Sequence, residues 1–147
     1  MASPAAVWRP VVTEILRERL DAGESLWLPI RGRSMRSLLG PGARILVTPC
    51  TRARFGDLLT YECEGALVCH RVIGRRGAAW LTRADHRGAG PEIVTAPQVL
   101  GVVVAFERDG VTVDLLTLRR RALATVAAAR SLAAAAWPAL RRRWQRA

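Results

Sequence analysis

A series of short apolar runs separated by turn residues most constrains the fold of this chain. The runs lie between residues 25 and 114 and are rich in Val, Ile and Leu. Gly40-Pro41-Gly42, Glu64-Gly65 and Asp109-Gly110 mark turns between them. This spacing predicts antiparallel strands joined as hairpins, and therefore a mostly β fold. The expected strands are Leu26–Ile30, Ala43–Thr48, Leu58–Cys63, Ala66–Ile73, Ala78–Arg83, Val99–Phe106 and Val111–Leu116.

Helical segments flank the predicted β region on both sides. In residues 7–22 an apolar stripe recurs at helical spacing, formed by Val11, Val12, Ile15, Leu16 and Leu20. Residues 117–147 are rich in Ala and Arg and also predict a helix. We therefore expect an N-terminal amphipathic helix in residues 1–24, a β domain in residues 25–116 and a basic helical tail in residues 117–147.

The tail concentrates the positive charge of the chain. All 23 basic residues are Arg, the formal net charge is +11, and residues 115–147 hold eight Arg and no acidic residue. Such a segment favours an anionic partner, either lipid or nucleic acid. The stretch is long enough to span a bilayer, which takes about 20 residues. However, a central charge such as Arg130 costs about 2.5–3.5 kcal/mol on insertion, so we favour a helix on a membrane surface or against the β domain.

Cysteine usage and the N-terminus bear on the compartment. Cys50, Cys63 and Cys69 are odd in number and not spaced as metal ligands, which predicts a reducing compartment and no metal or other cofactor. The first ten residues lack a secretory signal pattern. We therefore expect a cytoplasmic protein, at the inner face of the membrane if the tail binds lipid.

Two separate elements could carry chemistry. Ser34, in Gly32-Arg33-Ser34-Met35, follows a predicted strand, where a turn exposes a hydroxyl and Gly32 lets a substrate backbone approach. His70 lies in the middle of a strand, facing the same side as Val68 and Val72, while Cys69 and Arg71 face the other side. A rigid, partly desolvated imidazole suits a general base. Taken alone, Ser34 is more typical of a turn-forming serine, and His70 of a half-buried strand histidine that bonds a backbone carbonyl.

Asp85 stands where a strand enters a charged loop. Its carboxylate could accept the second imidazole N–H of His70 and fix the tautomer. An Asx turn is an equally good interpretation of an aspartate in this position.

Three stretches in this order resemble a known family. They are LPIRGRSMRSLLGPGARILVTP, GDLLTYECEGALVCHRVIGRRGAAWLTRAD and PQVLGVVV, and together they resemble the S24/S26 peptidase superfamily, which includes type I signal peptidases and LexA-like repressors. The likeness is greatest to the Ser–His branch of endoplasmic-reticulum-type and archaeal signal peptidases. The resemblance implies a signal-peptidase/LexA-like antiparallel β domain and serine endopeptidase activity on a peptide or protein substrate.

The resemblance also implies roles for single residues. Ser34 stands at the nucleophile, Met35 at its hydrophobic companion and His70 at the base. Asp85 stands at the third member, and Gly32 and Met35 lie beside the substrate. The sequence departs from the pattern at Ala84, where the family has glycine, and Glu92 is a second candidate for the acidic member.

Two further observations concern the function class. The chain has no Lys, so the Ser–Lys dyad of bacterial signal peptidases and LexA is excluded. The alternative to an enzyme is a non-catalytic LexA-like regulatory or interaction module with a basic membrane- or nucleic-acid-binding tail. Nucleic acid is the less expected partner, because one helix before the β domain is too short for a helix-turn-helix.

Overall fold

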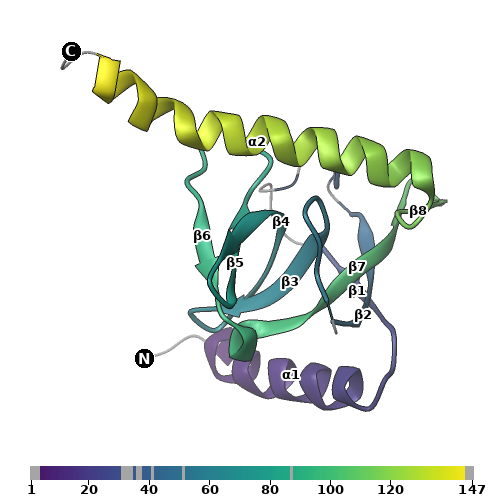
Figure 1. The fold of residues 1–147 in the computed structure, drawn as a ribbon. Helices are drawn as coiled ribbons and strands as arrows, with labels where there is room; N and C mark the ends of the chain where they lie inside the picture. Colours follow the sequence, from purple (N-terminus) through teal and green to yellow (C-terminus); the bar gives the residue numbers. More distant parts are fainter. Residues whose placement is uncertain are drawn as a thin grey trace.

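The computed structural model describes residues 4–30, 35, 38–40, 42–50, 52–86 and 88–144. Eight strands form one antiparallel sheet, with one long helix before it and one after it (Figure 1). The expectation of a mostly β fold with two flanking helices is confirmed. The elements are α1 (Pro4–Asp21), β1 (Leu26–Pro29), β2 (Arg44–Pro49), β3 (Leu58–Cys63), β4 (Ala66–Arg76), β5 (Ala79–Arg83), β6 (Glu92–Val94), the short helix η1 (Ala96–Gln98), β7 (Val99–Arg108), β8 (Val111–Asp114) and α2 (Leu118–Trp144).

The long strand β7 organises the sheet. The strand order is β1-β2-β7-β3-β4-β5-β6, and β8 pairs with the end of β7 as a hairpin. Gly101 of β7 lies opposite Pro49 of β2 and Thr60 of β3. A Cβ atom at this position would lie 2.3 Å from the carbonyl oxygen of Thr48, so the close approach of β2 and β7 requires glycine there.

The two faces of the sheet bury separate apolar clusters. One cluster includes Met35, Leu58 and Cys69, and the other includes Leu59, Tyr61 and Val72. Since side chains alternate along a strand, Cys69 and its neighbour His70 face opposite sides. The predicted division of β4, with His70 on the side of Val68 and Val72, is confirmed.

Helix α1 packs on the sheet with a different face from the one expected. Leu20 is fully buried and Leu16 packs on the same cluster, but Val11, Val12 and Ile15 are each about half exposed. The buried face instead follows residues 13, 16, 17 and 20, and Arg17 donates a hydrogen bond to the carbonyl oxygen of Val99 (3.1 Å). The expected apolar stripe was wrong because Thr13 and Arg17 supply part of the face that α1 buries against the sheet.

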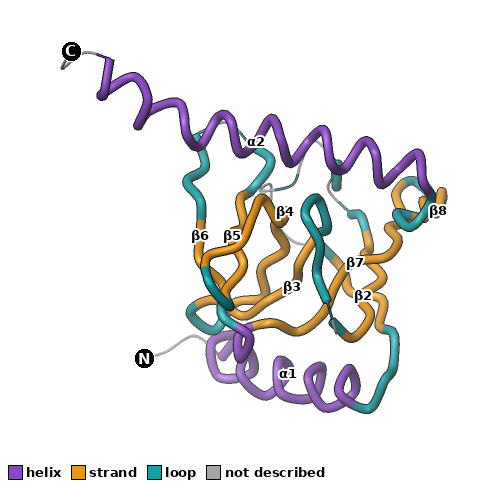
Figure 2. Tube along the Cα trace, in the orientation of Figure 1, coloured by secondary structure: helices purple, strands orange, loops and turns teal. Residues whose placement is uncertain are grey.

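Helix α2 lies across the opposite end of the sheet from α1 (Figures 1 and 2). Ala128 of α2 is fully buried against the sheet, and Arg83 of β5 donates a hydrogen bond to Oγ of Ser131 in α2 (2.8 Å). A Cβ atom at Gly56 would lie 3.0 Å from the backbone of Ala124, so the loop before β3 touches the helix directly. Within the part of the chain that the structure describes, no helix is long and apolar enough to cross a membrane.

The strand β6 was not expected from the sequence. The sequence predicts a charged, glycine-containing loop from Asp85 onward. In the structure Glu92–Val94 instead pairs with β5, and Glu92 lies opposite Thr82. Only three residues long, β6 is too short to give a periodic signal. Its position matters because it brings Glu92 onto the face of the sheet that holds His70.

Candidate functional site around His70

Four consecutive strands of the sheet each place one polar side chain on the same face. β3 contributes Tyr61, β4 contributes His70, β5 contributes Thr82 and β6 contributes Glu92. Leu59 is the direct partner of His70 on β3, so Tyr61 reaches the imidazole diagonally from two residues along the strand. The rigid sheet, and not a loop, therefore fixes the relative positions of the four side chains.

The hydrogen bonds among these side chains determine the histidine tautomer. Tyr61 Oη donates its one proton to Glu92 Oε2 in a short hydrogen bond. His70 Nδ1 lies 2.9 Å from the same phenol oxygen, so the imidazole must donate its Nδ1–H to it. Thr82 Oγ1, at 3.3 Å, is then the second donor to Tyr61 Oη. This arrangement leaves Nε2 as the unprotonated nitrogen, and no hydrogen bond from a described residue occupies it.

Burial and charge act on the imidazole in opposite directions. The side chain of His70 is only 9% exposed, and this desolvation lowers its pKa from the ordinary value of 6.5. The carboxylate of Glu92, 3.3 Å from Nδ1, works against this by favouring the imidazolium. Burial and the hydrogen bond to Glu92 raise the pKa of Tyr61 well above its usual value, so Tyr61 remains a phenol. The imidazole is thus neutral near pH 7, with a basic Nε2.

Asp85 does not contact His70, although the sequence suggested that it might orient the imidazole. Its carboxylate accepts hydrogen bonds from Nε (2.9 Å) and Nη2 (2.6 Å) of Arg71. Both side chains are buried, with 5% of Arg71 and 11% of Asp85 exposed, and Arg71 also donates to the carbonyl oxygen of Gly56 (2.9 Å). Arg71 faces away from His70 on β4, so this ion pair lies on the opposite side of the sheet. Glu92, the second candidate, is the acidic residue that reaches Nδ1.

Two of the other predicted site residues, Gly32 and Ser34, lie outside the described residues. Met35 is described and is 3% exposed, in the same buried cluster as Cys69, the residue next to His70. Its carbonyl oxygen accepts hydrogen bonds from the backbone N–H groups of Leu38 (3.0 Å) and Leu39 (2.7 Å). Met35, the residue that follows Ser34, is therefore anchored on the face of the sheet that Cys69 shares, away from the face that holds His70.

No family model and no curated protein matches the chain. What the site can do is therefore judged from its own residues. A neutral, buried imidazole suits a general base when one nitrogen is held by a hydrogen-bonded chain and the other has no hydrogen bond to any described residue.

Other residues near His70 are less suited to chemistry. Cys69 points to the other face of the sheet, and burial raises the pKa of its thiol to about 12, so it stays protonated and unreactive. His86 is exposed in the loop after β5. Among the described residues there is no cluster of His, Cys, Asp or Glu that could hold a metal ion.

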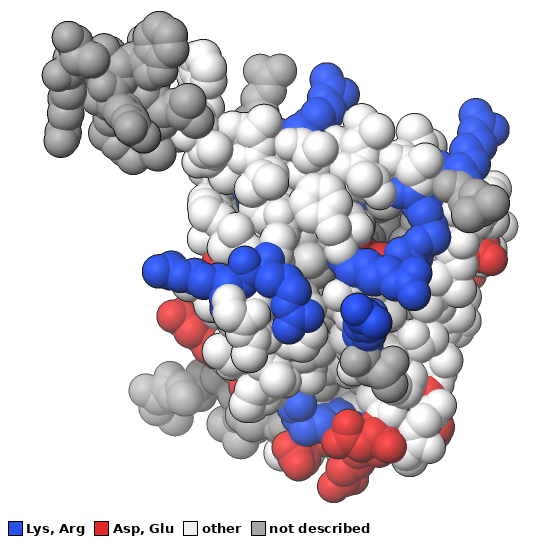
Figure 3. All heavy atoms as spheres, in the orientation of Figure 1, with Lys and Arg blue, Asp and Glu red and all other residues white. Residues whose placement is uncertain are grey.

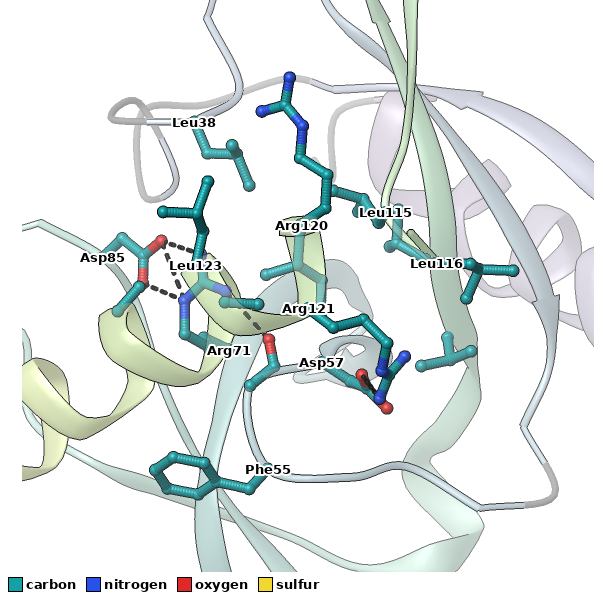
Figure 4. A pocket seen from close by; sticks show the side chains of 16 residues that line it. Leu38, Phe55, Asp57, Arg71, Asp85, Leu115, Leu116, Arg120, Arg121 and Leu123 are labelled. Carbon is teal, nitrogen blue, oxygen red and sulfur yellow. Dashed lines mark hydrogen bonds and ion pairs between the residues drawn. The ribbon is translucent and has the colours of Figure 1, made fainter. Parts of the chain in front are cut away.

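A cavity of about 270 Å³ lies on the side of the sheet away from His70, beneath α2 (Figure 4). Its walls are mostly apolar, and include Leu38, Phe55 and Leu123. Two ion pairs stand at its wall, Arg71 with Asp85 and Arg121 with Asp57 (3.3 Å). Since each charge in these pairs already has a partner, we assign the cavity wall a structural role in docking α2.

The titration of His70 gives a first test of the site. The chain has only two histidines, so NMR can follow each imidazole separately, with a His86→Gln variant to assign the signals. We expect the pKa of His70 to lie below 6.5, and Glu92→Gln to lower it further, because the carboxylate that favours the imidazolium is removed. Glu62→Gln is the matched control, since Glu62 contacts Arg17 instead (3.9 Å). A pKa that rises or stays unchanged in Glu92→Gln would contradict the assigned contact.

Proposed function

We propose that the chain is a serine endopeptidase with a signal-peptidase/LexA-like fold, in which Ser34 is the nucleophile and His70 the general base. The observation that supports this most is the fixed tautomer of His70, with Nδ1–H bound by Tyr61 and Nε2 left as an acceptor. Glu92 and Tyr61 take the part that an aspartate takes in a Ser–His–Asp triad. In this proposal Asp85 stabilises the fold through its buried ion pair with Arg71 and does not act in catalysis.

The proposed reaction proceeds in two steps. His70 Nε2 removes the proton of Ser34 Oγ as this oxygen attacks a peptide carbonyl carbon, and the imidazolium then protonates the leaving amine. A water molecule, deprotonated by His70, hydrolyses the acyl-enzyme and restores the serine. Positive charge develops on His70 during each step, and the chain from Nδ1–H through Tyr61 to Glu92 would stabilise it.

The sheet topology supports a peptide substrate. The terminal strands of the sheet are β1, which leads directly into the Ser34 segment, and β6, which carries Glu92. Unpaired backbone groups at such an edge can bind an extended peptide as an additional strand. Gly32, two residues before Ser34, would allow the substrate backbone to approach closely.

The fold assignment has its own support. The three stretches of sequence follow one another in the same order as in the family they resemble, and Gly101 of the third stretch lies where β7 packs closely beside β2. The observed antiparallel sheet is compatible with this family, and the proposed fold assignment rests on those three stretches.

The experiment that tests the function is cleavage of a diverse mixture of unstructured peptides, read by mass spectrometry. We expect wild-type protein to generate new peptide termini and Ser34→Ala to generate none, since the acyl-enzyme cannot form without the hydroxyl. Ser37→Ala is the matched control, because Ser37 lies in the same segment and has no proposed role. Cleavage by neither protein would favour the non-catalytic regulatory module, and equal cleavage by wild type and Ser34→Ala would exclude Ser34 as the nucleophile.

A further inference from the structure

Helix α2 has a docked face and an outward face. The docked face follows residues 121, 124, 128, 131 and 135, which are buried or half-buried against the sheet. The outward face follows residues 126, 130, 133 and 137, all of them exposed. Both series repeat at the spacing of a helical turn, so each forms a continuous stripe along the helix.

Apolar side chains on the outward side are unusually exposed. Val126 is 55% exposed and Trp137 is 65% exposed. Both lie on the side of α2 away from the sheet, so they contribute nothing to the packing of the domain. In Figure 1 the C-terminal part of the helix also extends beyond the sheet. Trp137 therefore does not pack α2 on the β domain.

The charge of α2 complements an anionic surface. Arg119, Arg120 and Arg130 are exposed, and the 27 residues of the helix include no Asp or Glu. Figure 3 shows basic side chains projecting from the upper edge, where α2 lies, and others across the middle of this face, while acidic side chains gather mainly at the lower end near α1. Nucleic acid would be attracted by the arginines and could stack a base on Trp137, but it would gain nothing from the exposed Val126 on the same side.

We propose that the outward face of α2 binds an anionic phospholipid bilayer, with Val126 and Trp137 inserted among the acyl chains and Arg119, Arg120 and Arg130 among the headgroups. Arg130 lies between Val126 and Trp137 on this face, and its long side chain can place the guanidinium among the headgroups while its stem lies along apolar side chains. Apolar and basic residues on one side of a helix favour a position in the plane of the interface, and Trp side chains prefer that depth. Helix α2 would then anchor the β domain to the membrane surface. This proposal is independent of the peptidase activity.

Flotation with lipid vesicles tests the proposal on the full chain. We expect binding to vesicles of phosphatidylcholine mixed with phosphatidylglycerol, and much weaker binding to phosphatidylcholine alone. Replacing Arg119, Arg120 and Arg130 together by Gln should lower the partition coefficient roughly a hundredfold, since each arginine near an anionic surface contributes about a fivefold factor. The charge-matched control replaces Arg44, Arg76 and Arg108, which are exposed on strands, and should bind nearly as wild type does.

The apolar contribution separates lipid from nucleic acid. Val126→Ser with Trp137→Ser should lower vesicle binding by about tenfold or more, whereas Ile15→Ser with Val111→Ser, equally exposed on α1 and β8, should not. The same variants are tested against a single-stranded oligonucleotide. The proposal is overturned if the anionic vesicles do not bind wild type, if the serine pair on α2 has no effect, or if the oligonucleotide competes fully with vesicles for wild type.

Discussion

Asp85→Asn should lower the free energy of unfolding by about 3–5 kcal/mol, because it leaves Arg71 buried and charged without its partner. Only 5% of the Arg71 side chain is exposed, so water cannot replace the lost carboxylate. Urea unfolding followed by tryptophan fluorescence measures the change. A loss of this size is a large part of the stability of a typical domain.

Two comparison variants sharpen this prediction. Glu24→Gln breaks the exposed ion pair of Glu24 with Arg19 and should change the stability little, since surface ion pairs are screened by solvent. The double variant Arg71→Met with Asp85→Leu should recover much of the loss, because neither charge is then buried alone. If Asp85→Asn is as stable as wild type, the contacts of Arg71 do not hold in solution. If it is stable but inactive, Asp85 acts in catalysis, contrary to the account given above.

His70→Ala should lower the rate of peptide cleavage about 10⁴-fold or more, as the loss of the base does in Ser–His peptidases. Tyr61→Phe should cause a smaller loss, because the Nδ1–H of His70 would still have the carboxylate of Glu92 nearby, at 3.3 Å. The rates are measured on the best substrate from the peptide mixture. Circular dichroism spectra of both variants, matched to wild type, would show that folding is intact.

A matched control for this series is His86→Ala, which removes the other histidine from the exposed loop after β5. It should retain nearly full activity. If His86→Ala loses as much activity as His70→Ala, the base is not His70 alone. If Tyr61→Phe is fully active, the hydrogen-bonded chain to Glu92 does not contribute to catalysis.

Much of the architecture could be predicted from the sequence because its signals are local. Glycine-containing turns and β-branched runs located seven of the eight strands, and alternation along β4 placed His70 and Cys69 on opposite faces. The three-residue β6 could not be predicted in this way, since pairing with β5 and not its own periodicity defines it. For the same reason the sequence left the choice between Asp85 and Glu92 open.

The partners of His70 depend on contacts across several strands. Tyr61 is the one tyrosine of the chain, and its place on the same face as His70 follows only from the β3–β4 register. Had that register been inferred from the Glu64-Gly65 turn, Tyr61 would have been a candidate partner. The ion pair of Asp85 with Arg71 could not be predicted either. Asp85 follows Arg83 by two residues and Arg71 by fourteen, and this spacing does not indicate which arginine it contacts.

The most direct test of a nucleophilic Ser34 is mass-spectrometric mapping of the residue modified by a serine-reactive fluorophosphonate. The account predicts one adduct per chain, located on Ser34, formed rapidly by wild type and very slowly by His70→Ala. An adduct on another serine, or equal labelling of wild type, Ser34→Ala and His70→Ala, would contradict it.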